Sequence, residues 1–165
     1  MQDEEFRIDF LDLLELTTEL FAVSMGVLSF VHQETVDPRT VWGVKPVTVP
    51  RKGSFSDVVI AQEDVFVIKD ATVDPAFAEH PYVKGEAGVR FYAGVPLQTE
   101  DGYRIGCLQI MDTKPRDFSE EEAKMLQTVA KQFMNRLEMS WRFYDLQKAR
   151  GFYQSLVDNL PKNLY

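Results

Sequence analysis

The sequence is poor in cysteine, in histidine and in basic side chains, and each scarcity excludes a class of function. Cys107 is the one cysteine, so an internal disulfide and a cysteine-rich metal site are excluded. The net charge of −8 argues against binding to nucleic acid or to an anionic membrane. No apolar run approaches the roughly 20 residues of a membrane span, and the acidic N-terminus lacks a signal-peptide core. We therefore expect a cytoplasmic protein.

What is present is typical of one folded domain. The chain has 165 residues, of which 45% are hydrophobic and 27% charged. Domains of roughly 100–200 residues are usual, so a single core is expected. A Gly-rich phosphate-binding loop of the P-loop or Rossmann type is absent from the sequence.

A hairpin over residues 91–111 is the clearest local signal. Two strands, 91–99 and 104–111, flank Asp101-Gly102, which favours a tight turn. Pro96 removes one ladder donor and predicts an edge-like position nearby. Alternation places Cys107, Gln109 and Met111 on one face, and Leu108 and Ile110 on the other. Phe91 and Tyr92 take opposite faces, and the sequence does not settle which is which.

Two long helices are predicted at the ends of the chain. Residues 3–22 repeat apolar side chains at three- and four-residue steps. Ser119 caps a second helix, 119–150, in which residues 126, 130, 133, 137, 140, 144 and 147 follow a coiled-coil period. A helix of this length is longer than a small domain is wide, so its far half should project and pair. The residues expected to form the dimer contacts and the signal relay are Phe10, Leu13, Leu126, Phe133, Leu137, Trp141 and Tyr144.

Shorter elements lie between these helices. Strands are predicted at 25–31, 40–49 and 65–69, with Asp37-Pro38 as the turn between the first two. Helical segments are predicted at 54–61 and 76–80, with 81–85 irregular. The predicted fold is therefore α+β: a mainly antiparallel sheet with the long helices on one face and segments 53–62 and 72–86 covering the other.

Several ordered blocks carry a family resemblance. They are residues 67–85, 91–97, 101–102, 105–108 and 112–116. Together they resemble a GAF domain of the bacterial sensor type over roughly residues 5–147. The tail from Phe152, with Leu156-Val-Asp-Asn-Leu-Pro161, resembles the opening of a PAS domain. The expected organisation is a GAF-like domain over 1–150 and a linker, or the start of a truncated PAS-like domain, over 151–165.

The resemblance implies a non-catalytic sensory module of a signalling protein, for example in a two-component system. Such modules usually precede a histidine kinase, a diguanylate cyclase or a phosphodiesterase. They commonly form homodimers through their terminal helices. The alternative is a ligand-free dimerisation and spacer module. Occlusion of the pocket by Phe55, Phe77 and Tyr82 would favour that alternative.

The candidate pocket lies where GAF domains close over a ligand, between the sheet and the two covering segments. Its predicted lining is Phe55, Asp57, Phe77, Tyr82, Tyr92, Cys107, Gln109 and Met111. The ligand is an unidentified small molecule, and no cofactor, metal or catalytic residue is predicted. Asp70 and Asp74 are interpreted as caps. His32 and His80 are expected at the surface, and Cys107 is expected to be buried and inert.

Overall fold

The computed structural model describes residues 2–158, with side chains from Phe10 onward. The sheet is antiparallel and six-stranded, in the order β3-β2-β1-β6-β5-β4. The elements in chain order are α1 (Gln2–Phe21), β1 (Met25–Val31), β2 (Thr35–Trp42), β3 (Val49–Pro50), α2 (Phe55–Ile60), β4 (Phe66–Ile68), the 3₁₀ turn η1 (Ala71–Val73), α3 (Pro81–Lys84), β5 (Phe91–Gln98), β6 (Arg104–Asp112) and α4 (Glu120–Asp158).

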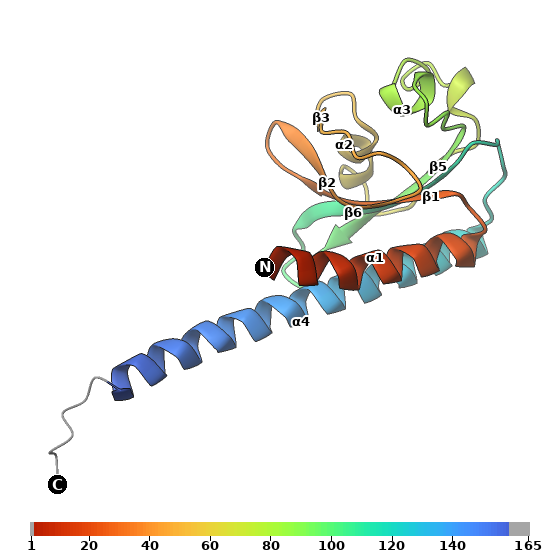
Figure 1. The fold of residues 1–165 in the computed structure, drawn as a ribbon. Coiled ribbons are helices and arrows are strands. Elements are labelled where there is room, and N and C mark those ends of the chain that lie inside the picture. Colours follow the sequence, from red (N-terminus) through yellow and green to blue (C-terminus); the bar gives the residue numbers. More distant parts are fainter. Residues whose placement is uncertain (1, 159–165) are drawn as a thin grey trace, which may run out of the picture.

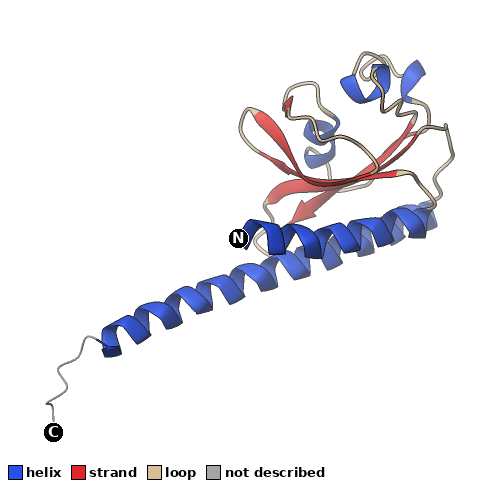
Figure 2. Cartoon of the chain, viewed as in Figure 1, coloured by secondary structure: helices blue, strands red, loops and turns tan. Residues whose placement is uncertain are grey.

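Three layers result, as the sequence predicts. The two long helices run side by side in opposite directions beneath the sheet, and α2 and α3 lie above it (Figures 1 and 2). The β5–β6 hairpin is present, and β6 pairs with β1 at the centre of the sheet. Because β4 pairs only with Tyr92 to Gly94 of β5, Pro96 lies where that strand has no neighbour on its outer side. The missing donor of Pro96 therefore interrupts no ladder on that side.

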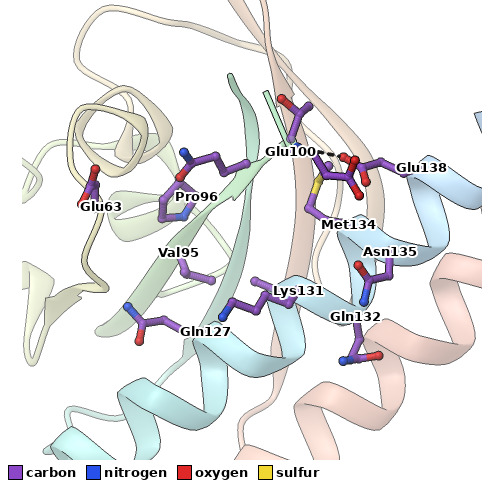
Figure 3. Close-up of a pocket in the computed structure, with 13 residues that line it drawn as sticks. Glu63, Val95, Pro96, Glu100, Gln127, Lys131, Gln132, Met134, Asn135 and Glu138 are labelled. Atoms are coloured by element: carbon purple, nitrogen blue, oxygen red, sulfur yellow. Dashed lines mark hydrogen bonds between the residues drawn. The ribbon is translucent and has the colours of Figure 1, made fainter. Parts of the chain in front are cut away.

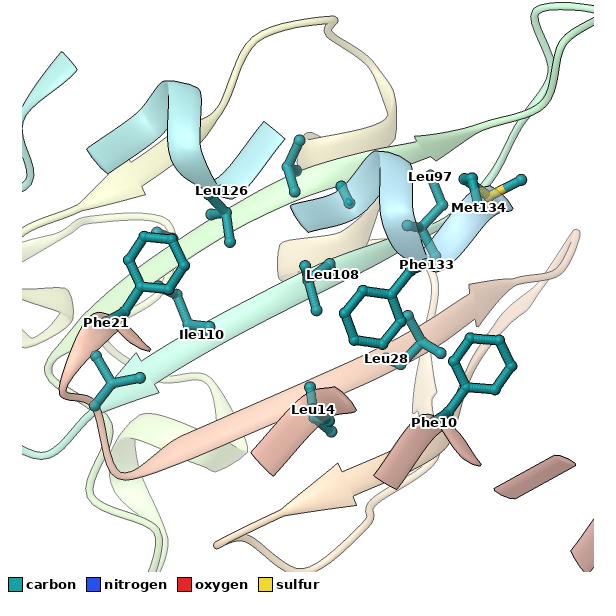
Figure 4. Close-up of a cluster of buried hydrophobic side chains, with 14 of the residues drawn as sticks. Phe10, Leu14, Phe21, Leu28, Leu97, Leu108, Ile110, Leu126, Phe133 and Met134 are labelled. Carbon is teal, nitrogen blue, oxygen red and sulfur yellow. The ribbon is translucent and has the colours of Figure 1, made fainter. Parts of the chain in front are cut away.

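One hydrophobic core fills the space between the sheet and the long helices (Figure 4). Leu108 and Ile110 of β6 face it, as alternation predicts, together with Phe91 of β5. The rings of Phe10 and Phe133 stack with centroids 5.7 Å apart and join α1 to α4. Among the side chains that the structure describes, the buried residues of this core are Phe10, Leu14, Phe21, Val23, Leu28, Phe91, Ala93, Val95, Leu97, Leu108, Ile110, Leu126, Ala130, Phe133, Met134 and Leu137.

A second cluster lies on the opposite face, under α2 and α3. Tyr92 faces this side, so the choice that the sequence left open is settled by the fold. Its members are Met25, Val27, Phe55, Val59, Ile68, Ala71, Phe77, Tyr82, Val83, Val89, Tyr92, Cys107 and Met111. The sheet therefore separates two chemically distinct interiors.

The relay residues predicted on the long helices fall into two groups. Phe10, Leu126, Phe133 and Leu137 are buried in the domain's own core, so they are not dimer contacts. The period of 126–137 reflects packing on the sheet, which needs the same spacing as a helix pair. Leu13 is half-buried against the core, and Trp141 and Tyr144 are exposed.

Helix α4 is longer than predicted. It has 39 residues and continues through Gly151, where the sequence predicted an end. Glycine in a helix costs only about 1 kcal/mol relative to alanine, too little to end it. Beyond the sheet the helix projects away from the domain (Figure 1). The predicted PAS-like opening overlaps the end of α4 and extends into residues 159–165, outside the described residues, and it stays a prediction.

Three local predictions were wrong. The strand predicted at 40–49 is instead β2 at 35–42, and residues 43–48 are not in a strand, because Gly43 takes a positive φ of 73° and Pro46 lacks an N–H. The other two predictions lie beside a proline. Pro38 lies inside β2, not in a turn, and it pairs with Ser29 where the register shifts. A bulge tolerates proline because one ladder bond is already absent there. Residues 75–79 form turns, and the helix begins at Pro81, with His80 as its cap. Proline is favoured at the first helical position because its missing N–H has no partner there in any case.

Within residues 2–158, neither long helix has an apolar stretch of the length that a bilayer crossing requires.

Candidate functional site

The layer above the sheet is built around one aromatic ring. Phe55, the first residue of α2, stacks between Phe77 and Tyr92, with centroids 4.4 and 4.3 Å away. The imidazole of His80 lies 4.3 Å from the same ring, tilted by 42°. Ser54 caps α2 by accepting from the amide of Asp57 at 3.1 Å, which fixes Phe55 in place. Phe55 therefore anchors α2 to the sheet.

Polar side chains on the sheet are paired with one another beneath this layer. The hydroxyl of Tyr92 donates to Oε1 of Gln109 at 2.7 Å. Nε2 of Gln109 donates to Oγ of Ser29 at 2.8 Å. The thiol of Cys107 donates to Oγ of Ser56 at 3.2 Å, which links the sheet to α2. Buried polar groups need such partners, and these four residues of the sheet have them.

Burial suppresses ionisation in this network. It raises the pKa of the Cys107 thiol to about 12. It also raises the pKa of the Tyr92 hydroxyl well above its ordinary value. Desolvation disfavours the charged form in both cases. Neither group is therefore a nucleophile or base at neutral pH, and the prediction that Cys107 is buried and inert agrees with this environment.

His80 is the exception among the buried polar side chains of the covering layer. Its Nδ1 accepts from the amide of Tyr82 at 3.1 Å, which caps α3. Nε2 is buried without a hydrogen-bond partner. Burial lowers the pKa of His80 to about 4, so the ring is neutral at pH 7. The prediction that His80 is a surface residue was wrong, because only 8% of it is exposed.

A small cavity of about 10 Å³ lies between the sheet and the covering layer. That volume is close to the space of one water molecule. Its lining combines hydroxyl, amide and imidazole groups with apolar side chains. The lining residues are Ser29, Val36, Pro38, Val47, Val49, Ser54, Phe55, Ser56, His80, Tyr82 and Gln109.

The structure divides the eight predicted pocket residues into three groups. Phe55, Tyr82 and Gln109 line the cavity. Asp57 does not, because it lies on the outer side of α2 with its side chain 39% exposed and paired with Arg51 at 2.8 Å. The remaining residues are buried in the cluster beside the cavity without lining it, and they are Phe77, Tyr92, Cys107 and Met111.

Sequence reasoning missed several lining residues, of which His80 is the most informative. The sequence signal for it was His80-Pro81, a capping side chain before a proline at the first helical position. The serines were missed because their burial depends on pairing across the sheet. Asp70 and Asp74 cap local turns as predicted, accepting from the amides of Thr72 and Ala76 at 3.0 and 2.8 Å.

A larger groove of about 520 Å³ lies on the helix side of the sheet (Figure 3). It is formed by α4, β5 and the loop before β4. Glu63, Lys131 and Glu138 give it charges of both signs, and Glu138 accepts from the amide of Glu100 at 3.2 Å. Neither of the two unpartnered buried side-chain atoms in the described residues, in Thr40 and His80, lines it. Within the same residues, no three His, Cys, Asp or Glu side chains lie close enough to hold a metal ion.

Comparison with known proteins identifies this architecture. The family model described as the GAF domain matches residues 10–137. The chain belongs to the GAF family. The match runs from α1 to the last core residue of α4, so it covers both clusters and the cavity between the sheet and its covering layer.

One curated relative of this GAF domain is a cyclic di-GMP phosphodiesterase of Pseudomonas aeruginosa. It is 32% identical over 155 residues, a match that covers 93% of this chain and 26% of that protein. The chain thus spans about a quarter of the length of that relative.

Solved structures agree on the fold. The blue-light absorbing form of the PixJ GAF domain of Thermosynechococcus elongatus has a TM-score of 0.69 at 15% identity, covering 98% of both chains. A type II free methionine-R-sulfoxide reductase of Thermoplasma acidophilum has a TM-score of 0.68 at 16% identity, covering 81% of this chain and 92% of that one. At these identities the likeness shows the fold alone.

Proposed function

We propose that this GAF domain is a non-catalytic sensor that binds a small molecule in the cavity between the sheet and its covering layer. The observation that carries the proposal is the buried, unpartnered Nε2 of His80 beside a cavity lined by hydroxyl and amide groups. A buried polar atom without a partner is costly and rare in a folded protein, so each one calls for an explanation. A bound ligand would supply the missing partner.

The curated relative suggests what such a sensor would regulate. That relative is a cyclic di-GMP phosphodiesterase, and the matched part is about a quarter of it. We propose that this domain controls an enzyme of cyclic-dinucleotide signalling in the same chain or complex.

The route of the signal would be the hairpin and α4. The turn between β5 and β6 contacts α4 twice: Glu100 donates its amide to Glu138, and its carboxylate pairs with Arg142 at 3.3 Å. β6 carries Gln109 toward the cavity and Leu108 toward the helices. A shift of β6 on ligand binding would therefore reach α4 through both the core and the hairpin turn.

The partner of the helices would be a second copy of this chain. Leu16 and Leu20 are exposed on α1, one turn apart. Met139, Phe143 and Leu146 are exposed on α4 at four- and three-residue steps, the spacing of a coiled-coil seam. Exposed apolar side chains in such a stripe are typical of a protein interface.

The dimer is tested by one substitution on this stripe. Phe143→Glu places a charge among the apolar side chains, so we expect the dissociation constant of the dimer to rise at least about tenfold, roughly 1.4 kcal/mol. Thr128→Glu adds the same charge at an exposed position of the sheet-bound half of α4 and should leave association unchanged. Analytical ultracentrifugation measures both. A wild-type monomer at all concentrations would contradict the dimer relay.

A second candidate function is a ligand-free dimerisation and spacer module. The stack of Phe55 between Phe77 and Tyr92 favours it, because these rings already fill most of the space above the sheet. The rings would then serve only the packing of the layer. The two candidates agree on the dimer and differ on the ligand.

A thermal-shift screen with cyclic nucleotides, amino acids and tetrapyrroles, together with native mass spectrometry of the purified protein, separates the two. A ligand at a hundred times its dissociation constant stabilises the folded state by about 2.7 kcal/mol, a readily measured shift. A retained or stabilising small molecule supports the sensor. A dimer that retains nothing and responds to no compound supports the spacer.

A further inference from the structure

The hydrogen bonds of His80 fix where its ring proton lies. Nδ1 accepts from the amide of Tyr82 at 3.1 Å, so Nδ1 carries no hydrogen. A neutral imidazole has one N–H, and here it must be on Nε2. His80 therefore offers a donor to the cavity, not an acceptor.

Nε2 of His80 is the one side-chain polar atom of the cavity lining that is buried without any hydrogen-bond partner. Oγ of Ser29 and Oγ of Ser56 accept from Gln109 and Cys107. Ser54 both donates to the carbonyl of Arg51 and accepts from the amide of Asp57. The other unpartnered buried atom in the described residues, Oγ1 of Thr40, belongs to a residue that pairs with Leu28 and so faces the long helices. Within the described residues, no group of the cavity lining accepts a hydrogen bond from Nε2.

The lining carries no formal charge at neutral pH. None of its residues is Asp, Glu, Lys or Arg, and the titratable groups among them are His80 and Tyr82. Burial lowers the pKa of His80 to about 4 and raises the pKa of Tyr82, so both are neutral. The nearby ion pair of Arg51 with Asp57 is internally matched and lies outside the lining. An ionised ligand would lose its hydration here without gaining a counter-charge.

We propose that the molecule sensed in this cavity is small and uncharged, and that its carbonyl-type oxygen accepts a hydrogen bond from Nε2–H of His80. This assignment rests on the proposed sensor function and specifies the ligand class for it. Amides, ureas and lactams belong to this class. His80 acts as the recognition residue, and its cap on α3 transmits the contact to the covering layer.

Val47 and Val49, from the segment of residues 43–50, form part of the cavity lining. Strand β3 in this segment has only two residues, paired with Thr35 and Val36 at the edge of the sheet. Tyr82 of α3 lines the same cavity. A ligand larger than a water molecule does not fit the cavity as it stands, so its binding would have to move part of the lining.

The test uses isosteric probes and ¹⁵N-histidine NMR on the intact protein. Formamide, formate and formamidinium have the same heavy-atom skeleton but differ in charge and in acceptor oxygens. We expect a neutral ring with Nε2 protonated at pH 7, and a saturable shift of the His80 Nε2–H signal with formamide. Formate should act more weakly, and formamidinium, which has no acceptor, should not act. Because a ligand of three heavy atoms binds no more tightly than about 1 mM, titrations extend to about 0.1 M.

Two variants separate the roles of the ring nitrogens. Asn at position 80 keeps an acceptor for the Tyr82 amide but lacks the distal N–H, so His80→Asn should fold. Its affinity for formamide should fall at least about tenfold, because one good hydrogen bond to a buried group is lost. His80→Gln lacks the cap geometry but places an amide N–H near the Nε2 position, so it should retain part of the response. His32→Asn, at the other and exposed histidine, should change nothing.

Several results would overturn the assignment. One is that formamide leaves the His80 Nε2–H signal unchanged. The others are that formamidinium shifts this signal as much as formamide does, or that formate binds most tightly of the three probes. A compound from the thermal-shift screen that binds while leaving Nε2–H unaffected would also overturn it, although the sensor function itself would stand. If formamide and the whole screen are both silent, the sensor function fails as well.

Discussion

The buried imidazole of His80 makes a quantitative prediction about acid stability. Its pKa is about 4 in the folded protein and about 6.5 in an unfolded chain, so the unfolded state binds a proton first as the pH falls. The contribution of His80 to the free energy of unfolding is therefore fully present above pH 6.5, and it is lost as the pH falls from 6.5 to 4. A difference of 2.5 pKa units corresponds to at most about 3.4 kcal/mol, and integration from pH 7.5 to pH 4 gives about 3 kcal/mol.

The measurement is a difference between two proteins, so that acid effects shared by both cancel. The free energy of unfolding is measured by urea titration at each pH for wild type and His80→Asn, with tryptophan fluorescence on dilute protein. Asparagine keeps a cap for the Tyr82 amide and does not titrate. The advantage of wild type over the variant should shrink by about 2 to 3 kcal/mol between pH 7.5 and pH 4. The same comparison with His32→Asn measures how much an exposed histidine contributes to the pH dependence of the free energy of unfolding.

A flat difference between wild type and His80→Asn would refute the reasoning. It would mean that the ring is hydrated in the folded state, and that the cavity is open to solvent. An advantage that grows toward acid pH would be equally contrary, because it would require a partner that stabilises the imidazolium.

Three further results are expected. Gly106→Ala puts a Cβ 2.1 Å from a backbone oxygen of β1, so it should destabilise the fold by about 3 kcal/mol in urea titrations. Gly151→Ala, with no atom within 4 Å of the new Cβ, should not destabilise the protein and should favour the helix locally by up to about 1 kcal/mol. Tyr92→Phe removes the donor to Gln109 and leaves a buried acceptor unpaired, which should cost about 1–3 kcal/mol by the same assay. Cys107 should react with a thiol reagent at pH 8 only as fast as the protein unfolds, because its pKa is about 12 and its side chain is buried; rapid labelling of the native protein would show that the covering layer opens.

The layers of this fold were predictable because they follow from periodicity. Alternation in β6 separated Leu108 from Gln109, and both faces were assigned correctly once the long helices were placed on one side. The hairpin turn and the Ser119 cap, which accepts from the amide of Glu122 at 3.1 Å, rest on local chemistry that a sequence displays directly.

The cavity was harder to predict because its lining comes from register and local turns. Asp57 and Ser56 are neighbours in α2, yet one faces solvent and the other the sheet. His80 is polar and follows Glu79, so its residue type alone indicates a surface residue. Its burial follows from stacking on Phe55, a contact between distant parts of the chain. The PAS-like resemblance at the C-terminal end stays a prediction.

The division of α4 into a sheet-bound half and a projecting half has a consequence for its length. Leu137 fixes the rotational phase of the helix against the sheet, and Phe143 lies six residues farther on. Each residue of an α-helix turns the next by about 100°. One residue inserted between these positions would thus rotate Phe143 about the helix axis by about 100°, whereas seven inserted residues would nearly restore its orientation. The direction in which the projecting half presents its apolar side chains therefore depends on the number of residues before it. Insertions of seven residues, about two helical turns, should be tolerated better than insertions of one.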